Sequence, residues 1–249
     1  MTIAAIIQAR MSSTRLPGKV LRLLCGKTIL AHVIDRVRAS RAIDEIIVAT
    51  TDQPADDSIG ALVPMLDATL FRGSEDDVLS RFYCAALAAK ADTIVRVTAD
   101  CPLFDGVLLH AMIEEFTVQR RRGEPLDYLS NTLSRTYPRG LDAEIVDFAA
   151  LERAQRDATQ PFEREHVTPY IYGHPEWFAL KNFAGTPDLS SHRWTLDTEE
   201  DWRLIEAIYT ALYRKDRLIA TPEILALLER QPALVALNAH IVQKATAHA

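Results

Sequence analysis

The sequence predicts an α/β fold with a mostly parallel central sheet. A short, continuous apolar run at residues 2–7, and runs of similar, largely apolar character at 45–50 and 92–99, are typical of strands buried on both faces, as in parallel sheets. Helical patterns at residues 28–40 and 74–90 separate these runs, so that strands and helices alternate. The chain of 249 residues is long enough to bury a large core around such a sheet.

Both helical patterns have a recognisable start. In residues 28–40, Thr28 is the expected N-cap, and one stripe of the helix is apolar: Ile29, Leu30, Val33, Ile34 and Val37. In residues 74–90, Ser74 is the expected N-cap, and the acidic residues after it suit the positive end of the helix dipole. Each helix therefore has a face that can pack on the sheet.

The pattern changes in the second half of the chain. We expect, in order, strands at 126–131 and 140–148, a helix at 148–156, a proline-broken helix and a strand within 164–183, and helices at 197–213 and 221–230 before a polar, loose tail. Because no repeat or linker interrupts the chain, we expect one domain, residues 1–249, with sections at 1–125, 126–215 and 216–249.

Composition disfavours several classes of protein. The formal net charge of −6 gives no overall basic field for nucleic acid. Charged residues interrupt every apolar run well before the roughly 20 residues of a membrane-spanning helix. The first residues lack the basic region of a signal peptide, and three well-separated cysteines do not suggest a disulfide framework. We therefore expect a cytoplasmic protein that binds neither nucleic acid nor membrane.

The loop after the first apolar run concentrates positive charge. Its sequence, QARMSSTRLPGK at residues 8–19, contains Arg10, Arg15 and Lys19. Ligands of parallel sheets bind at the carboxyl ends of the strands, where this loop begins. Arginine and lysine side chains suit phosphate oxygens, and Gly18 lets backbone amides approach a ligand. The loop favours a phosphate-bearing ligand, although its composition also fits a solvated basic loop.

Two commoner phosphate-binding motifs are absent from the sequence. The GKT at residues 26–28 is not a Walker A loop, because Leu21 stands where that motif requires a glycine. The dinucleotide fingerprint G-x-G-x-x-G is also missing. An ordinary turn and helix cap therefore explains residues 26–28.

Six segments, taken in order, resemble one enzyme family. They are QARMSSTRLPGK (8–19), RGSEDDVLSRF (72–82), VRVTADCPL (95–103), SNTLSRTYPRGLDAEIV (130–146), EREHVTPYIY (163–172) and RWTLDTEEDWRLI (193–205). They resemble the sugar-activating cytidylyltransferases, a group that includes the CMP-sialic acid and CMP-KDO synthetases, and within it the branch of the spore coat polysaccharide biosynthesis protein SpsF. One such motif would be weak support, whereas the ordered set is specific.

The resemblance implies a Rossmann-like, three-layer nucleotidyltransferase fold with a mostly parallel central sheet and a small inserted β subregion. Residues 1–125 would form the nucleotide-binding half, and residues 126–215 would form the acceptor-binding and dimerisation half. The implied reaction transfers CMP from CTP to a sugar or sugar acid, with release of pyrophosphate, in polysaccharide or glycoconjugate biosynthesis. The nucleophile would be either a hydroxyl or a phosphate of the acceptor.

The resemblance also implies residue roles. The catalytic residues would be Arg10, Arg15, Lys19, Asp100 and Asp197. Further contacts to CTP would come from Gln8, Ala9, Gly18, Arg72, Gly73, Ser74, Thr98 and Ala99. Asp100 and Asp197 would hold Mg²⁺, which takes one or two carboxylates together with water and phosphate oxygens. Each aspartate also has a simpler explanation as a turn former or helix cap.

The acceptor side is defined by mixed charges. The candidate substrate-binding residues are Arg139, Asp142, Glu144, Glu165 and His166. They suit a polar sugar that carries a carboxylate or phosphate, and His166 either binds this sugar or is structural. Related enzymes commonly form homodimers, and residues 141–148 are a candidate interface.

Three other interpretations stay open. A glycosyltransferase would consume a nucleotide sugar, but the D-x-D metal motif of such enzymes is absent from TADCP at residues 98–102. A sugar-phosphate pyrophosphorylase would use UTP or GTP, and the sequence alone does not decide the base. A non-catalytic binding module is disfavoured because the sequence has all five residues that match the catalytic positions of the family.

Overall fold

The computed structural model of the chain describes residues 1–242; the end of the predicted tail, residues 243–249, lies outside the described residues. The strands are β1 (Ile3–Gln8), β2 (Leu23–Leu24), β3 (Lys27–Thr28), β4 (Glu45–Thr51), β5 (Thr69–Gly73), β6 (Thr93–Thr98), β7 (Tyr128–Ser130), β8 (Glu144–Asp147) and β9 (Leu180–Asn182). The α-helices are α1 (Ile29–Arg38), α2 (Asp57–Leu62), α3 (Val78–Ala88), α4 (Gly106–Arg121), α5 (Phe148–Asp157), α6 (Pro161–His166), α7 (Pro169–Tyr172), α8 (Glu199–Leu212), α9 (Thr221–Arg230) and α10 (Pro232–Ala236).

The described residues form a mixed, mostly parallel sheet of seven strands in the order β5-β4-β1-β6-β8-β7-β9. Strands β5, β4, β1 and β6 are mutually parallel, whereas β8 runs antiparallel to both of its neighbours. The strands β7, β8 and β9 extend this sheet, and β2 and β3 form a separate ribbon. The topology confirms the predicted α/β class and the three strands predicted from apolar runs.

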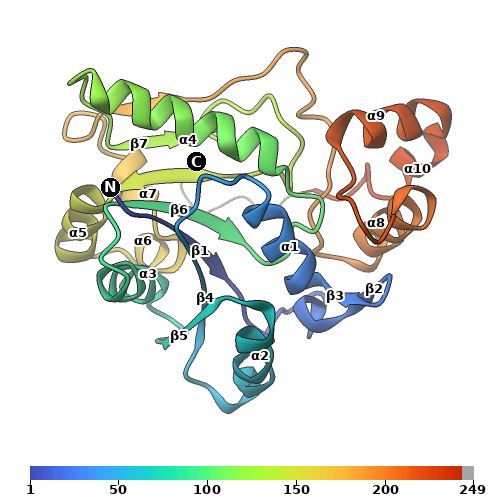
Figure 1. The fold of residues 1–249 in the computed structure, drawn as a ribbon, viewed down its shortest axis with the longest axis horizontal. Helices are drawn as coiled ribbons and strands as arrows, with labels where there is room; N and C mark the ends of the chain where they lie inside the picture. Colours follow the sequence, from blue (N-terminus) through green and yellow to red (C-terminus); the bar gives the residue numbers. More distant parts are fainter. Residues whose placement is uncertain (243–249) are drawn as a thin grey trace.

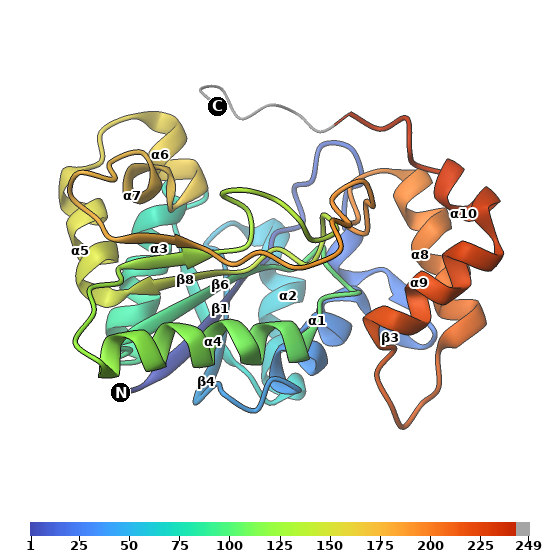
Figure 2. The same ribbon diagram turned by 90° about the horizontal axis from the view of Figure 1, so that it is seen from above.

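Helices cover both faces of the sheet, so the molecule has three layers (Figures 1 and 2). Alternate residues of β1 contribute to two separate apolar clusters: Ile7 belongs to the cluster that contains α1 and α4, and Ile6 to the cluster that contains α3 and α5. This alternation follows from the two-residue period of a strand. Both faces of β1 are therefore buried, which explains its uninterrupted apolar sequence.

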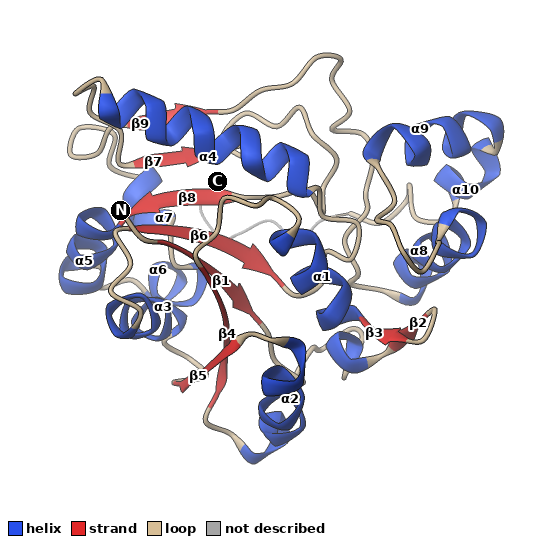
Figure 3. Ribbon diagram, viewed as in Figure 1, coloured by secondary structure: helices blue, strands red, loops and turns tan. Residues whose placement is uncertain are grey.

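The three C-terminal helices α8, α9 and α10 lie together at one side of the molecule, beyond the ends of β1 and β6 toward which the strand arrows point (Figures 1 and 3). They contribute to the same apolar cluster as α1, through side chains such as Ile205 and Ile224. Among residues 1–242, no helix combines the length and the apolar character needed to cross a membrane.

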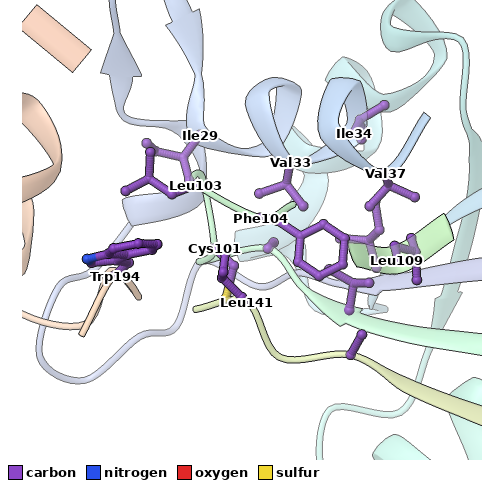
Figure 4. Packing of buried hydrophobic residues seen from close by; sticks show 14 of the residues in the cluster. Ile29, Val33, Ile34, Val37, Cys101, Leu103, Phe104, Leu109, Leu141 and Trp194 are labelled. Atoms are coloured by element: carbon purple, nitrogen blue, oxygen red, sulfur yellow. The ribbon is translucent and has the colours of Figure 1, made fainter. Parts of the chain in front are cut away.

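The segment that follows β6 is held by apolar packing (Figure 4). Cys101, Leu103 and Phe104 are buried in one cluster with side chains of α1. Leu141 and Trp194 join this cluster from distant parts of the chain. Packing against α1, Leu141 and Trp194 therefore holds the backbone immediately after residue 100 in place.

One expectation about the fold was wrong. The N-cap of α3 is Asp77, whose carboxylate accepts the Ser80 N–H at 2.9 Å. The Ser74 hydroxyl instead accepts the Asp77 N–H at 3.0 Å, so it shapes the turn before the helix. The candidate dimer interface at 141–148 contains β8, an interior strand that pairs with β6 and β7, so a dimer contact there would not form by edge-to-edge strand pairing. By contrast, Thr28 caps α1 as predicted.

Candidate active site

The cation-rich loop after β1 is closed by hydrogen bonds. The Gly18 N–H donates to the Met11 carbonyl at 3.0 Å, and Gly18 has a φ of 69°, in the left-handed region that glycine adopts easily. The buried carboxylate of Asp56 accepts the Met11 N–H at 2.7 Å. Burial alone would raise the pKa of Asp56, but hydrogen bonds from Thr51, Met11 and Thr50 lower it, so Asp56 stays charged while it holds the loop.

A cleft of about 540 Å³ opens at the carboxyl ends of β1 and β6. Twelve of the predicted site residues line it: Gln8, Arg10, Arg15, Lys19, Thr98, Ala99, Asp100, Arg139, Asp142, Glu165, His166 and Asp197. The remaining lining residues are Ser13, Thr14, Val20, Cys101, Gly140 and Thr195. Most of the residues predicted from both halves of the chain therefore meet in one cavity.

Lys19 lies between the two aspartates. Its ammonium group donates to Asp100 Oδ2 at 2.8 Å, to Asp197 Oδ1 at 2.9 Å and to the Leu196 carbonyl at 2.7 Å. Burial lowers the pKa of Lys19, but the two carboxylates outweigh burial and raise it. Burial raises the pKa of Asp100, but Lys19 and Thr98 lower it to about 2, from an ordinary value of 3.8. Lys19 and Asp100 are therefore both charged at neutral pH.

Two further cations contact the second carboxylate oxygen of Asp197. Arg15 Nη2 lies 3.1 Å from Oδ2, and Arg193 Nη2 donates to the same oxygen at 2.9 Å. Asp197 does not cap α8, because Thr198 occupies the N-cap position and its hydroxyl accepts the Asp201 N–H. The capping explanation of Asp197 is thus wrong, and its carboxylate faces the cleft.

Backbone contacts bring the residue 193–197 segment to the end of β6. The Leu196 N–H donates to the Asp100 carbonyl at 2.8 Å, and the Trp194 N–H donates to the Arg139 carbonyl at 2.6 Å. Gly140 has a φ of 106°, and a Cβ there would lie 2.5 Å from the Trp194 carbonyl carbon. The close approach of these segments therefore requires glycine at position 140.

Four of the residues predicted to bind the acceptor line the cleft: Arg139, Asp142, Glu165 and His166. Arg135 forms a two-pronged ion pair with Asp142, with distances of 2.5 and 2.9 Å. Glu165 and His166 end the short helix α6, after which Val167 adopts a φ of 75°. A β-branched residue rarely adopts this conformation, so the surrounding fold imposes the turn beside the cleft.

Six predicted site residues do not line the cleft: Ala9, Gly18, Arg72, Gly73, Ser74 and Glu144. Arg72 instead donates to the carbonyls of Thr51 and Gln53, each at 2.9 Å. Glu144 is buried and is paired with Arg96, and it accepts hydrogen bonds from Tyr128 and Thr168. Substrate binding by Glu144 is therefore contradicted, because its carboxylate is used inside the fold.

Sequence reasoning missed two residues that support the site. Asp56 holds the cation-rich loop, and nothing in the sequence marks it apart from other acids of an ordinary turn. Arg193 contacts Asp197, but nothing in the RWTLDTEED motif distinguishes it from an ordinary charged residue. The contacts of Asp56 with Met11 and of Arg193 with Asp197 form only in the folded chain, so the local sequence pattern does not reveal them.

The geometry agrees with comparisons to known proteins. The cytidylyltransferase family model matches residues 4–215. The chain belongs to the cytidylyltransferase family. It is 37% identical over 238 residues to the spore coat polysaccharide biosynthesis protein SpsF of Bacillus subtilis strain 168, covering 92% of this chain and 95% of that protein.

Two further similarities support the assignment. The chain is 38% identical over 211 residues to the 3-deoxy-manno-octulosonate cytidylyltransferase of Geobacter metallireducens, covering 75% of this chain and 81% of that protein. The solved structure of a cytidylyltransferase from Leptospira borgpetersenii superposes with a TM-score of 0.90 at 32% identity, covering 98% of this chain and 100% of that one. As a cytidylyltransferase, the protein transfers the cytidylyl group of CTP, which decides against the glycosyltransferase and the UTP- or GTP-dependent interpretations.

Proposed function

We propose that this cytidylyltransferase joins CMP from CTP to a sugar or sugar-acid acceptor, at the cleft, with Mg²⁺ as cofactor. The observation that carries the proposal is the meeting of Arg15, Lys19, Asp100 and Asp197 at the carboxyl edge of the sheet. Cations and carboxylates arranged in this way suit a metal-bound triphosphate. The similarity to SpsF and to the Geobacter enzyme supports a sugar acid of polysaccharide biosynthesis as the acceptor.

The cations of the loop have a direct role in this reaction. An acceptor oxygen attacks the α-phosphorus of CTP, the bond from that phosphorus to the bridging oxygen breaks, and pyrophosphate leaves with the electron pair. Arg10, Arg15 and Lys19 line the cleft and can hold the phosphates in line, so that they stabilise the charge that grows on pyrophosphate. An acceptor phosphate needs no general base, whereas a hydroxyl must lose its proton.

The donor set fits magnesium. Asp100 and Asp197 each place one carboxylate oxygen within 2.9 Å of the same Lys19 ammonium, so the two carboxylates converge on a small volume. Hard oxygen ligands of this kind, completed by phosphate oxygens and water, are what Mg²⁺ prefers. When bound there, Mg²⁺ supplies additional positive charge against the phosphate oxygens.

Nucleotide preference tests the proposal. We expect CTP with magnesium to raise the melting temperature of the protein more than UTP, GTP or ATP does, because bound ligand stabilises the folded state. Chelation with EDTA should remove most of this stabilisation. Pyrophosphate release is then measured across a panel of sugar acids and sugar phosphates. Equal shifts for all four nucleotides, or none, would contradict the cytidylyl assignment.

Arg139 is the cation best placed to bind an acidic acceptor. It lines the cleft, and within residues 1–242 no hydrogen bond or ion pair involves its guanidinium, whereas Arg135 is paired with Asp142. Burial and, to a smaller extent, the nearby positive charge of Arg135 lower the pKa of Arg139. A bound anion would therefore stabilise the charged guanidinium of Arg139 in the cleft. We propose that Arg139 binds the carboxylate or phosphate of the acceptor.

The Arg139→Leu variant tests this contact. We expect the KM for the acceptor to rise about tenfold or more, on the scale of a charged hydrogen bond, with the KM for CTP nearly unchanged. Steady-state pyrophosphate release with each substrate varied in turn measures both constants. Arg121→Leu, at the exposed end of α4, is the control and should change neither. An unchanged acceptor KM in Arg139→Leu would remove Arg139 from the acceptor site.

A homodimer and a cytoplasmic location remain part of the proposal. The homodimer rests on the resemblance to sugar-activating enzymes, and the cytoplasmic location rests on the composition of the sequence. Analytical ultracentrifugation tests the dimer, and strand β8 is not available for edge pairing in it because both of its edges are already paired.

A further inference from the structure

A buried polar network lies directly behind Asp197. Its centre is Asp201, whose side chain is 0% exposed and accepts hydrogen bonds from several donors. Arg193 donates to it through Nε at 2.9 Å and Nη2 at 3.0 Å, and the backbone N–H groups of Asp197 and Thr198 each donate at 3.0 Å. Of these hydrogen bonds, the capping box of α8 needs only the one from the Thr198 N–H to Asp201. The hydrogen bonds from Arg193 and from the Asp197 N–H are therefore not required for capping the helix.

The C-terminal segment completes this network. Asn238 follows α10 and is buried. Its amide donates to Asp201 Oδ1 at 2.8 Å and to the Arg193 carbonyl at 2.9 Å. One side chain thereby holds both members of the Arg193–Asp201 pair. Because a buried ion pair is costly unless its remaining hydrogen-bonding groups are satisfied, Asn238 is important for keeping this pair in one geometry.

Arg193 differs from the other cations around Asp197. Lys19 and Arg15 line the cleft, so a triphosphate would compete with Asp197 for both of them. Arg193 is not among the cleft-lining residues, and its guanidinium is held by Asp201, which does not line the cleft either. A substrate in the cleft would therefore not compete for Arg193, whose contact with Asp197 Oδ2 at 2.9 Å leaves Oδ1 to Lys19 or to a ligand.

We infer that Arg193, Asp201 and Asn238 are positioning residues that hold the Asp197 carboxylate in its working orientation, so that the C-terminal segment is part of the active-site architecture. The inference rests on the proposed role of Asp197 in CMP transfer. None of the three residues lines the cleft. Arg193 contacts the Asp197 carboxylate, Asp201 holds both Arg193 and the Asp197 backbone N–H, and Asn238 holds Asp201.

The Asn238→Ala variant tests the inference. We expect kcat for pyrophosphate release to fall about tenfold, as for the loss of one hydrogen bond to a charged group, while the KM for the acceptor changes little. Leu234→Ala is the matched control, because Leu234 packs in α10 and has no polar contact with the network. We expect this control to lower the melting temperature but to keep its kcat.

A double-mutant cycle separates positioning from general weakening of the fold. In an Asp197→Ala background, Asn238→Ala should change kcat by no more than about twofold, because there is no carboxylate left to position. The same cycle is run on the melting-temperature increase caused by CTP and magnesium, which needs no turnover. Equal effects of Asn238→Ala in both backgrounds, or full kcat in Asn238→Ala itself, would overturn the inference. A wild-type protein that is not stabilised by CTP and releases no pyrophosphate would instead contradict the proposed function.

Discussion

The Asp197→Asn variant should lose roughly a hundredfold in kcat, which corresponds to about 3 kcal/mol of transition-state stabilisation. Asparagine keeps the size of the side chain but removes the negative charge, and with it the ability to hold Mg²⁺ near the phosphates. It also leaves Lys19, Arg15 and Arg193 around a neutral group. Steady-state pyrophosphate release under saturating CTP measures the effect.

Two comparisons make this result informative. Asp100→Asn should lose activity to a similar degree, because Asp100 contacts the same ammonium group from the opposite segment. Glu200→Gln is the control: Glu200 lies in the first turn of α8 and does not line the cleft, so we expect wild-type kcat. Full activity of either aspartate variant would end the metal assignment for that residue.

A second large effect is expected for Lys19→Met. Methionine has a similar length but no charge, so Asp100 and Asp197 would face each other without the cation that separates them, and the Leu196 carbonyl would lose its donor. Removing one partner from a buried charge cluster typically costs about 3–5 kcal/mol of folding free energy. We also expect kcat to fall about a thousandfold, because the proposed contact of this cation with the leaving pyrophosphate is lost.

Chemical denaturation measures the stability change of Lys19→Met, and pyrophosphate release on the folded fraction measures kcat. Lys27→Met is the control, because Lys27 forms an exposed ion pair with Asp35, and such pairs contribute about 1 kcal/mol or less. This control should therefore keep both stability and activity. If Lys19→Met retained wild-type kcat, Lys19 would have only a structural role.

The strands and the first helices were predictable because their signals are local. The largely apolar runs of β1, β4 and β6 reflect burial on both faces, and Thr28 caps α1 through a hydrogen bond that spans three residues. The N-cap of α3 was misplaced because Ser74 and Asp77 are both good cap residues, and local pattern does not decide between them. Glu144 was misassigned because a charged residue in a strand looks exposed until its partner, Arg96, is found on the neighbouring strand.

The sequence by itself determined the α/β class, the cation-rich loop after the first strand and the pair of aspartates that the family motifs point to. Only the tertiary structure decided that Asp100 and Asp197 converge on Lys19, that Asp56 holds the loop, and that Asn238 supports the pair behind Asp197. The physical reason is that strand and cap signals arise between near neighbours in the chain. The charge contacts of the cleft, in contrast, join segments that come together only when the sheet has formed.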